Sequence, residues 1–130
     1  MKSPFEFYPE VVLAYQYGSS VKQKDRPPRD RDIAVLLIPD TPAERRFEIQ
    51  AELGNRLKEE GEPEADVRVL NQSSPIYAFQ VVKEGRLLFG DPALARKFIF
   101  ETLTRYFDYL PIHRFFVERL ERRLGVPFHG

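Results

Sequence analysis

The chain contains no cysteine and only two histidines, His113 and His129. Without cysteine, a disulfide framework and a thiolate metal site are both excluded. Two histidines are too few for a histidine-rich zinc site, and we expect both to be surface or packing residues. A metal ion in this protein would therefore be held mainly by oxygen atoms, which suits magnesium or manganese.

An excess of charge of one sign is also missing, because 20 basic residues balance 20 acidic residues. This balance argues against general nucleic-acid binding, which needs a basic footprint, and leaves only a local basic patch open. No apolar run reaches the roughly 18 residues of a membrane helix. The N-terminal MKSPFEFYPE is acidic and broken by proline, unlike a signal peptide. We therefore expect a soluble, cytoplasmic protein.

The chain does contain enough apolar residues for one core. A length of 130 residues with 42% hydrophobic residues is typical of a single domain. Short β-branched and aromatic runs predict strands at 11–17, 32–38, 65–70 and 86–89. Helices are expected at 42–60, 75–82, 92–109 and 112–124. This order predicts an α/β (α+β) fold in which helices flank a short mixed sheet. One domain would span residues 1–130, with its core at about 8–98 and C-terminal helices at about 92–124.

Two details of these helices follow from the sequence. Thr41 is expected to be the N-cap of the first helix, with Pro42 at its first position and Glu44 completing a capping box. The apolar face of that helix is expected to include Phe47, Ala51 and Leu57.

The most informative segment is Gly18-Ser19, followed after ten residues by Asp30-Arg31-Asp32. Gly-Ser follows a predicted strand, and Asp-x-Asp opens the next one. Side chains two residues apart on an extended segment point to the same side, so Asp30 and Asp32 present two carboxylates to one point. Two such anions repel each other unless a divalent cation lies between them. The spacing therefore predicts a magnesium site.

A third carboxylate, Asp66, is predicted at the start of another strand. Neighbouring strands lie about 4.8 Å apart, so Asp66 can flank the same metal site as Asp30 and Asp32. Two metal ions could then clamp the attacking and leaving oxygens of an in-line displacement. Asp66 could also accept the proton of the attacking hydroxyl.

Gly18 and Ser19 are candidates for phosphate binding. A glycine lets the backbone approach a ligand closely, and Ser19 offers a hydroxyl and an amide donor. Lys22 is a nearby cation for a triphosphate. Gly18, Ser19 and Lys22 are therefore the predicted nucleotide-binding residues.

The segment GSSVKQKDRPPRDRD resembles the GS-x10-DxD signature of the minimal nucleotidyltransferases (MNT), within the DNA polymerase β-like superfamily. The following ADVRVLNQSSPIYAFQVVKEGRLLF is similar to the family segment that holds the third aspartate, a helix and a Gly-Arg hairpin. The resemblance covers the chain from Val11 to about Phe98. It implies the nucleotidyltransferase fold, a short mixed sheet with flanking helices.

Within that family, the chain most resembles the MNT antitoxins, which pair with HEPN-domain ribonuclease toxins. The resemblance implies an enzyme that transfers AMP from ATP to a tyrosine of the toxin and silences it. Gly18 and Ser19 would hold phosphate, Asp30 and Asp32 would bind magnesium, and Asp66 would be the third carboxylate. The implied partners are the toxin and ATP.

Other interpretations of the same residues stay open. Asp30 and Asp32 could be loop carboxylates paired with Arg29 and Arg31, and Gly18-Ser19 could be an ordinary turn. The acceptor could instead be a small-molecule hydroxyl, such as that of an antibiotic, or an RNA end. The protein could also neutralise a partner by binding alone.

The C-terminal region is more apolar than one helix face requires. Its large apolar residues are Phe98, Ile99, Phe100, Leu103, Tyr106, Phe107, Tyr109, Leu110, Phe115, Phe116 and Leu120. They could form the core together with a packed last helix. Alternatively, they could form an interface for the toxin or for a second copy, because large exposed apolar patches mark partner surfaces.

Overall fold

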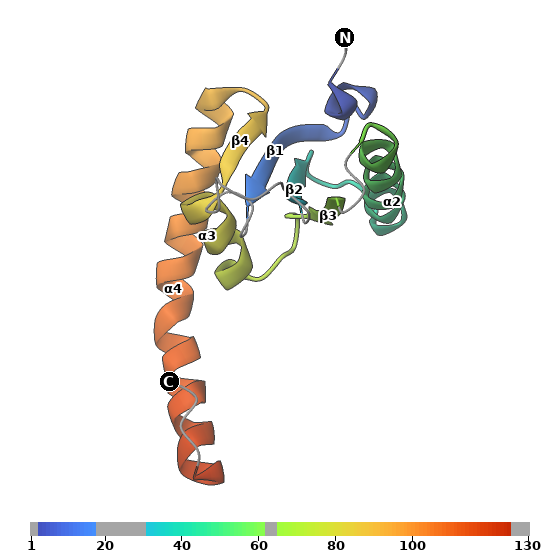
Figure 1. Cartoon of the computed structure of the whole chain (residues 1–130). Helices are drawn as coiled ribbons and strands as arrows, with labels where there is room; N and C mark the ends of the chain where they lie inside the picture. The colour runs from blue at the N-terminus through green and yellow to red at the C-terminus, as the bar shows by residue number, and fades with distance from the viewer. Residues whose placement is uncertain (1–2, 18–30, 62–64, 126–130) are drawn as a thin grey trace, which may run out of the picture.

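The computed structural model describes residues 3–17, 31–61 and 65–125. Its elements in chain order are the 3₁₀ helix η1 (Pro4–Phe7), β1 (Val11–Tyr17), β2 (Arg31–Leu37), α2 (Ala43–Glu59), β3 (Ala65–Val69), α3 (Pro75–Glu84), β4 (Arg86–Phe89) and α4 (Pro92–Leu124). Figure 1 shows a sheet with helices on both sides. The predicted fold class and the four predicted strands are confirmed, with differences of one residue at most at the strand ends.

The four strands form one mixed sheet in the order β3-β2-β1-β4. β1 lies antiparallel to both β2 and β4, whereas β2 and β3 run parallel. The parallel pair needs a crossover connection, and α2 supplies it between β2 and β3. As a result, the start of β2, the start of β3 and the end of β1 meet at one end of the sheet.

Each face of the sheet packs against different helices (Figure 1). One face forms a core with α2 and the N-terminal residues Phe5 and Tyr8. The other face forms a second core with α3 and the first half of α4, through Ala78, Val81 and Phe98. The sheet is therefore the middle of three layers.

Helix α2 buries a different face from the predicted one. Its buried residues are Ile49, Leu53 and Leu57, which follow each other at intervals of four. Phe47 is 73% exposed. Two residues along a helix turn by about 200°, so Phe47 and Ile49 lie on nearly opposite sides. Leu57 was assigned correctly, whereas Phe47 and Ala51 were wrong.

The predicted capping box of α2 is also wrong. Pro42 is the N-cap residue, and no side chain caps the helix. The hydroxyl of Thr41 instead donates a hydrogen bond to the carbonyl oxygen of Ile38, at 2.7 Å. Thr41 closes the turn after β2, because a threonine hydroxyl can bond to the backbone in turns as well as at caps.

Helix α4 is one continuous helix of 33 residues, rather than two helices separated at Pro111. Proline removes one backbone donor, but its fixed φ is compatible with helical geometry. The two ends agree with the sequence. Asp91 caps the start by accepting from the amide of Ala93, and Gly125 ends the helix with a φ of 68°.

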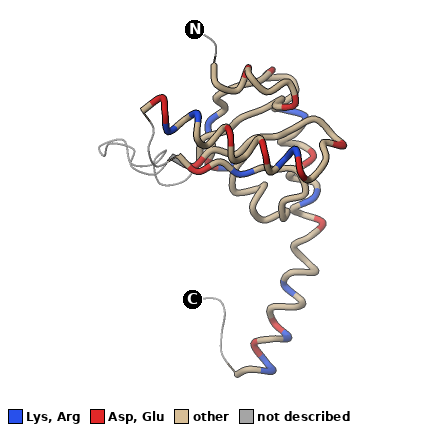
Figure 2. The backbone as a smooth tube through the Cα atoms, turned by 90° about the vertical axis from the view of Figure 1, so that its right-hand side faces the viewer, with Lys and Arg blue, Asp and Glu red and all other residues tan. Residues whose placement is uncertain are grey.

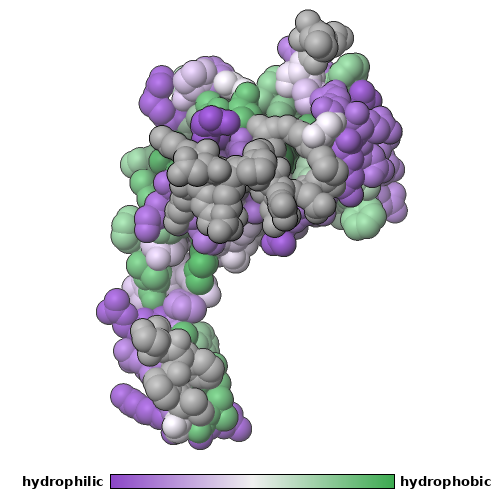
Figure 3. Space-filling view, in the orientation of Figure 1, coloured by the Kyte–Doolittle hydropathy of each residue, from purple (hydrophilic) through white to green (hydrophobic). Residues whose placement is uncertain are grey.

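The second half of α4 extends away from the three layers (Figure 1). Several of its large apolar side chains are exposed, namely Phe107, Ile112, Phe115, Phe116, Leu120 and Leu124. Figure 3 shows hydrophobic surface along this part of the helix, and Figure 2 shows acidic and basic residues interspersed with it. These residues do not belong to the two described cores, so an interface with the toxin or a second copy stays a prediction.

Within the described ranges, no helix combines the length and the apolar character that crossing a membrane requires.

Candidate active site

Three polar side chains form a row across three strands at one end of the sheet. Tyr17 of β1 is the Cα partner of Asp32 on β2, and Asp32 is the Cα partner of Asp66 on β3. Side chains at partnered positions of adjacent strands lie on the same face, with Cβ atoms about 5 Å apart. The register therefore brings two carboxylates and one phenol together. We refer to Tyr17, Asp32 and Asp66 as the carboxylate row.

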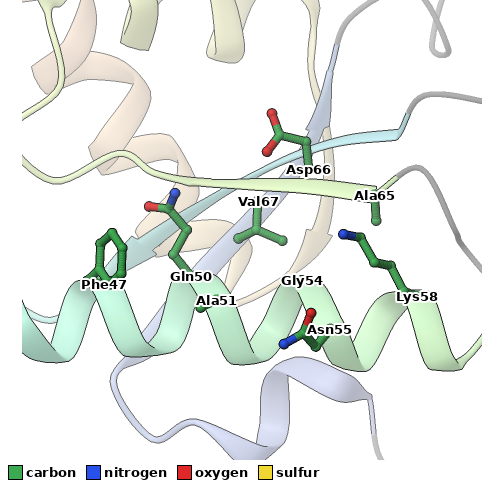
Figure 4. A pocket seen from close by; sticks show the side chains of 9 residues that line it. All are labelled: Phe47, Gln50, Ala51, Gly54, Asn55, Lys58, Ala65, Asp66 and Val67. Atoms are coloured by element: carbon green, nitrogen blue, oxygen red, sulfur yellow. The ribbon is translucent and has the colours of Figure 1, made fainter.

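The carboxylate row lies on the face of the sheet that α3 and α4 cover in part. Successive side chains of a strand alternate between faces, and the next residues, Ile33 and Val67, belong to the core under α2. Figure 4 shows Val67 directed toward α2 and Asp66 directed to the other side of β3. The side chain of Asp66 is 57% exposed, so ligands from solvent can reach it.

Arg68 partners the carboxylate of Asp66. It follows two residues later on β3 and therefore lies on the same face. Its Nε lies 3.4 Å from the Oδ2 of Asp66. Both side chains are more than half exposed, and such pairs contribute at most about 1 kcal/mol to stability. A metal ion or a ligand could exchange this contact at little cost.

Tyr77, in the first turn of α3, reaches the other end of the row. Its hydroxyl lies 2.6 Å from the hydroxyl of Tyr17, and the two rings meet edge to face at 5.7 Å. Burial raises the pKa of both phenols above the ordinary value, and the carboxylate of Asp32 adds to the shift. The pair therefore stays protonated at neutral pH, and because one hydroxyl donates to the other, it leaves one O–H donor beside the carboxylates.

The structure describes only two of the predicted site residues. Asp32 and Asp66 lie side by side, as the predicted strand adjacency requires. Asp30, Gly18, Ser19 and Lys22 lie outside the described residues, so their predicted roles stay predictions.

The carboxylates that the structure describes at this site fit a divalent cation. Asp32 and Asp66 supply carboxylate oxygens, which magnesium prefers. Among residues 3–17, 31–61 and 65–125, no group of three His, Cys, Asp or Glu side chains could hold a metal ion. A three-carboxylate site would therefore need Asp30, which precedes Asp32 by two residues in the sequence.

A cavity of about 250 Å³ lies between α2 and β3, on the opposite face. Its lining includes Phe47, Gln50 and Lys58 (Figure 4). Asp66 is also among the lining residues, but its carboxylate is directed away from α2 (Figure 4). The cavity and the carboxylate row are therefore separate features.

Sequence reasoning missed three residues of this site: Tyr17, Arg68 and Tyr77. A signal was available for two of them. Tyr17 directly precedes Gly18, and Arg68 shares the strand face of Asp66 through the period of two. Tyr77 had no such signal, because its approach depends on how α3 packs on the sheet.

The comparisons with known proteins agree with this geometry. Residues 1–92 match the family model described as Polymerase beta, Nucleotidyltransferase. No curated protein matches the chain.

Several solved structures share the fold. A toxin-antitoxin complex with AMP-PNP contains a chain that is 23% identical, with a TM-score of 0.74, covering 90% of this chain and 92% of that one. The complex of a tri-AMPylated Shewanella oneidensis HEPN toxin with its MNT antitoxin contains another, 23% identical, with a TM-score of 0.68, covering 88% and 87%. The toxin-antitoxin MntA-HepT contains a third, 23% identical, with a TM-score of 0.68, covering 90% of each chain.

Proposed function

Because the chain belongs to the polymerase beta nucleotidyltransferase family, we propose that it transfers AMP from ATP to a tyrosine of a HEPN-domain ribonuclease and acts as the antitoxin of that toxin. The observation that carries this proposal is the pairing of Asp32 with Asp66 across parallel strands. Both carboxylates belong to a partly open sheet face, and Asp32 is the last residue of the GS-x10-DxD segment.

In this proposal, the tyrosine hydroxyl of the partner attacks the α-phosphorus of ATP. The new O–P bond forms while the bond to the pyrophosphate breaks, and pyrophosphate leaves. Asp66 accepts the proton of the attacking hydroxyl, because it is the exposed carboxylate of the row. Gly18, Ser19 and Lys22 hold the triphosphate.

Magnesium would be held by Asp30, Asp32 and Asp66, and when bound it supplies positive charge for the phosphate oxygens in the displacement. Without a counter-charge, neighbouring carboxylates repel each other. Arg68 offsets part of this repulsion at Asp66. The proposal places the reaction in the cytoplasm, where ATP is available.

The similar solved structures support the choice of substrate and partner. One is described as a toxin-antitoxin with AMP-PNP, and another as a tri-AMPylated HEPN toxin in complex with an MNT antitoxin. Their chains are close in length to this one, since about nine tenths of each is covered.

The test is incubation of the protein with labelled ATP, magnesium and a candidate HEPN ribonuclease from the same organism. We expect label on a toxin tyrosine, located by mass spectrometry, and a loss of ribonuclease activity. A stable complex without label on the toxin would contradict the transfer step.

A second candidate function is neutralisation by binding alone, which the exposed apolar side chains of α4 favour. The variant carrying Asp30→Asn and Asp32→Asn separates the two candidates. If this variant binds the toxin but no longer protects against it, binding alone is ruled out. Full protection by the variant would favour binding over transfer.

A further inference from the structure

Arg68 is the basic side chain that the described contacts bring to the carboxylate row. Its Cα partner on β2 is Ala34, a small and fully buried residue. The guanidinium carbon lies 5.9 Å from the centre of the Tyr77 ring, within reach of a cation–π interaction. Its Nε contacts Asp66 at 3.4 Å. Arg68 is thus held between a ring of α3 and a carboxylate of the row.

These contacts leave most of the guanidinium unused. An arginine side chain carries five N–H donors, and the described hydrogen bond uses only the one on Nε. Within the described ranges, the two Nη groups of Arg68 donate to no acceptor. The side chain is 60% exposed, so the free donors remain open to solvent and to ligands.

The position of this cation matches the needs of a phosphate. A nucleotide that reacts at Asp32 and Asp66 brings its phosphates to the face on which Arg68 lies. The planar guanidinium can donate two parallel hydrogen bonds to phosphate oxygens, which a lysine cannot do. The single long contact with Asp66 is weak enough to exchange for them.

We propose that Arg68 binds a phosphate group of the nucleotide at the carboxylate row, and that the ring of Tyr77 positions its guanidinium. In the nucleotide-free protein, Arg68 serves as the counter-ion of Asp66. When a nucleotide binds, the Nη groups of Arg68 donate to its phosphate oxygens. The inference rests on the proposed function only in taking a nucleoside triphosphate as the ligand.

The test is the affinity for AMP-PNP with magnesium, measured by calorimetry on the full chain. We expect Arg68→Gln to weaken binding about 10- to 50-fold, as the loss of a charge-assisted bidentate contact does. The affinity of Arg68→Lys should lie between those of the wild type and Arg68→Gln, because lysine keeps the charge but cannot donate two parallel hydrogen bonds. The matched control is Arg45→Gln, because Arg45 is an ion-paired arginine of α2, bonded to Glu10. It should leave the affinity unchanged.

Two further measurements separate phosphate binding from a merely structural role. Adenosine has no phosphate, so its affinity should be the same in the wild type and in Arg68→Gln. Manganese binding without nucleotide, followed by electron paramagnetic resonance, should be unchanged or tighter in Arg68→Gln, because Asp66 loses its competing partner. Tyr77→Leu removes the ring and should weaken AMP-PNP binding a few-fold, less than Arg68→Gln does.

Each outcome decides a different point. Equal AMP-PNP affinity in the wild type and Arg68→Gln overturns the inference and leaves the proposed function standing. An equal loss for adenosine and AMP-PNP also overturns it, because the effect is then not on phosphate. A wild type that binds no AMP-PNP overturns both. A phosphate-specific loss in a protein that labels no toxin supports Arg68 and removes only the proposed acceptor.

Discussion

The two faces of the sheet differ in what they bury. On the face under α2, Ile33, Val35 and Val67 meet Ile49 and Leu53, and all of these side chains are almost fully buried. The opposite face also has an apolar core, but it ends in Tyr17, Asp32 and Asp66, which α3 and α4 cover only in part. Polar groups are retained where α3 and α4 leave the sheet partly uncovered.

This difference separates stability from chemistry within one small sheet. Burial of apolar side chains provides most of the favourable free energy of folding, and the α2 face is devoted to it. The other face places the carboxylates of Asp32 and Asp66 at paired positions, an arrangement of like charges that needs a counter-charge. Adjacent residues of one strand, such as Asp32 and Ile33, therefore have opposite consequences when they are changed.

The largest expected effect is that of Asp32→Asn on the proposed transfer activity. We expect a loss of about 1,000-fold, because the substitution removes a charge that the metal-assisted displacement needs. The melting temperature is measured alongside, so that a loss of folding is distinguished from the loss of the charge at the site. Labelled ATP and thermal melting give the two readouts. Full activity in the variant would refute the role of the carboxylate row.

Leu53→Ala tests the face under α2. It should lower the stability of the protein and leave the nucleotide site unchanged. Leu53 is fully buried between α2 and the sheet, and its truncation should lower the free energy of unfolding by about 2–5 kcal/mol. Urea denaturation measures this, and nucleotide binding to the remaining folded protein should be unchanged. The control on the same helix is Phe47→Ala, which should cost less than about 1 kcal/mol because Phe47 is 73% exposed. Equal costs would contradict the observed packing of α2.

Sequence reasoning predicted the elements better than it predicted their faces. β1 and β4 were predicted to the residue, because apolar runs bounded by glycine and proline are a strong local signal. The face of α2 was missed because Phe47 was placed on the apolar face, although Ile49, Leu53 and Leu57 recur at intervals of four. The continuity of α4 through Pro111 was missed because the local cost of a proline was taken as decisive.

The candidate site shows the same limit. Asp32 and Asp66 were predicted as neighbours because two strand starts were recognisable in the sequence. The Tyr17–Tyr77 contact could not be predicted, since it joins residues 60 positions apart and depends on the docking of α3. Tertiary packing, rather than local propensity, determined that part of the site.

A smaller change in the free energy of unfolding is expected from Thr102→Val. Thr102 lies on α4 and is 1% exposed, and its hydroxyl has no hydrogen-bond partner among the described residues. Valine keeps the branched shape without the buried hydroxyl, so the free energy of unfolding should rise by about 1 kcal/mol. The control is Thr104→Val, where an exposed hydroxyl donates to Phe100, and little change is expected. A destabilised Thr102→Val would mean that this hydroxyl does find a partner.

The smallest effect is expected from Tyr77→Phe, as a change in how stability depends on pH. Burial raises the pKa of Tyr77 and of Tyr17, so the folded protein keeps protons that the unfolded chain loses near the ordinary tyrosine pKa of about 10. The free energy of unfolding therefore falls as the pH rises above that value, whereas below it this contribution is fully present. Removing the Tyr77 hydroxyl should make the decline between pH 9 and pH 11 shallower in urea denaturation. Measurement of the same variant at pH 8 isolates the pH-independent cost of losing the hydrogen bond to Tyr17. Parallel curves for the two proteins would mean that the hydroxyl pair, like the apolar side chains of the α2 face, does not make stability depend on pH.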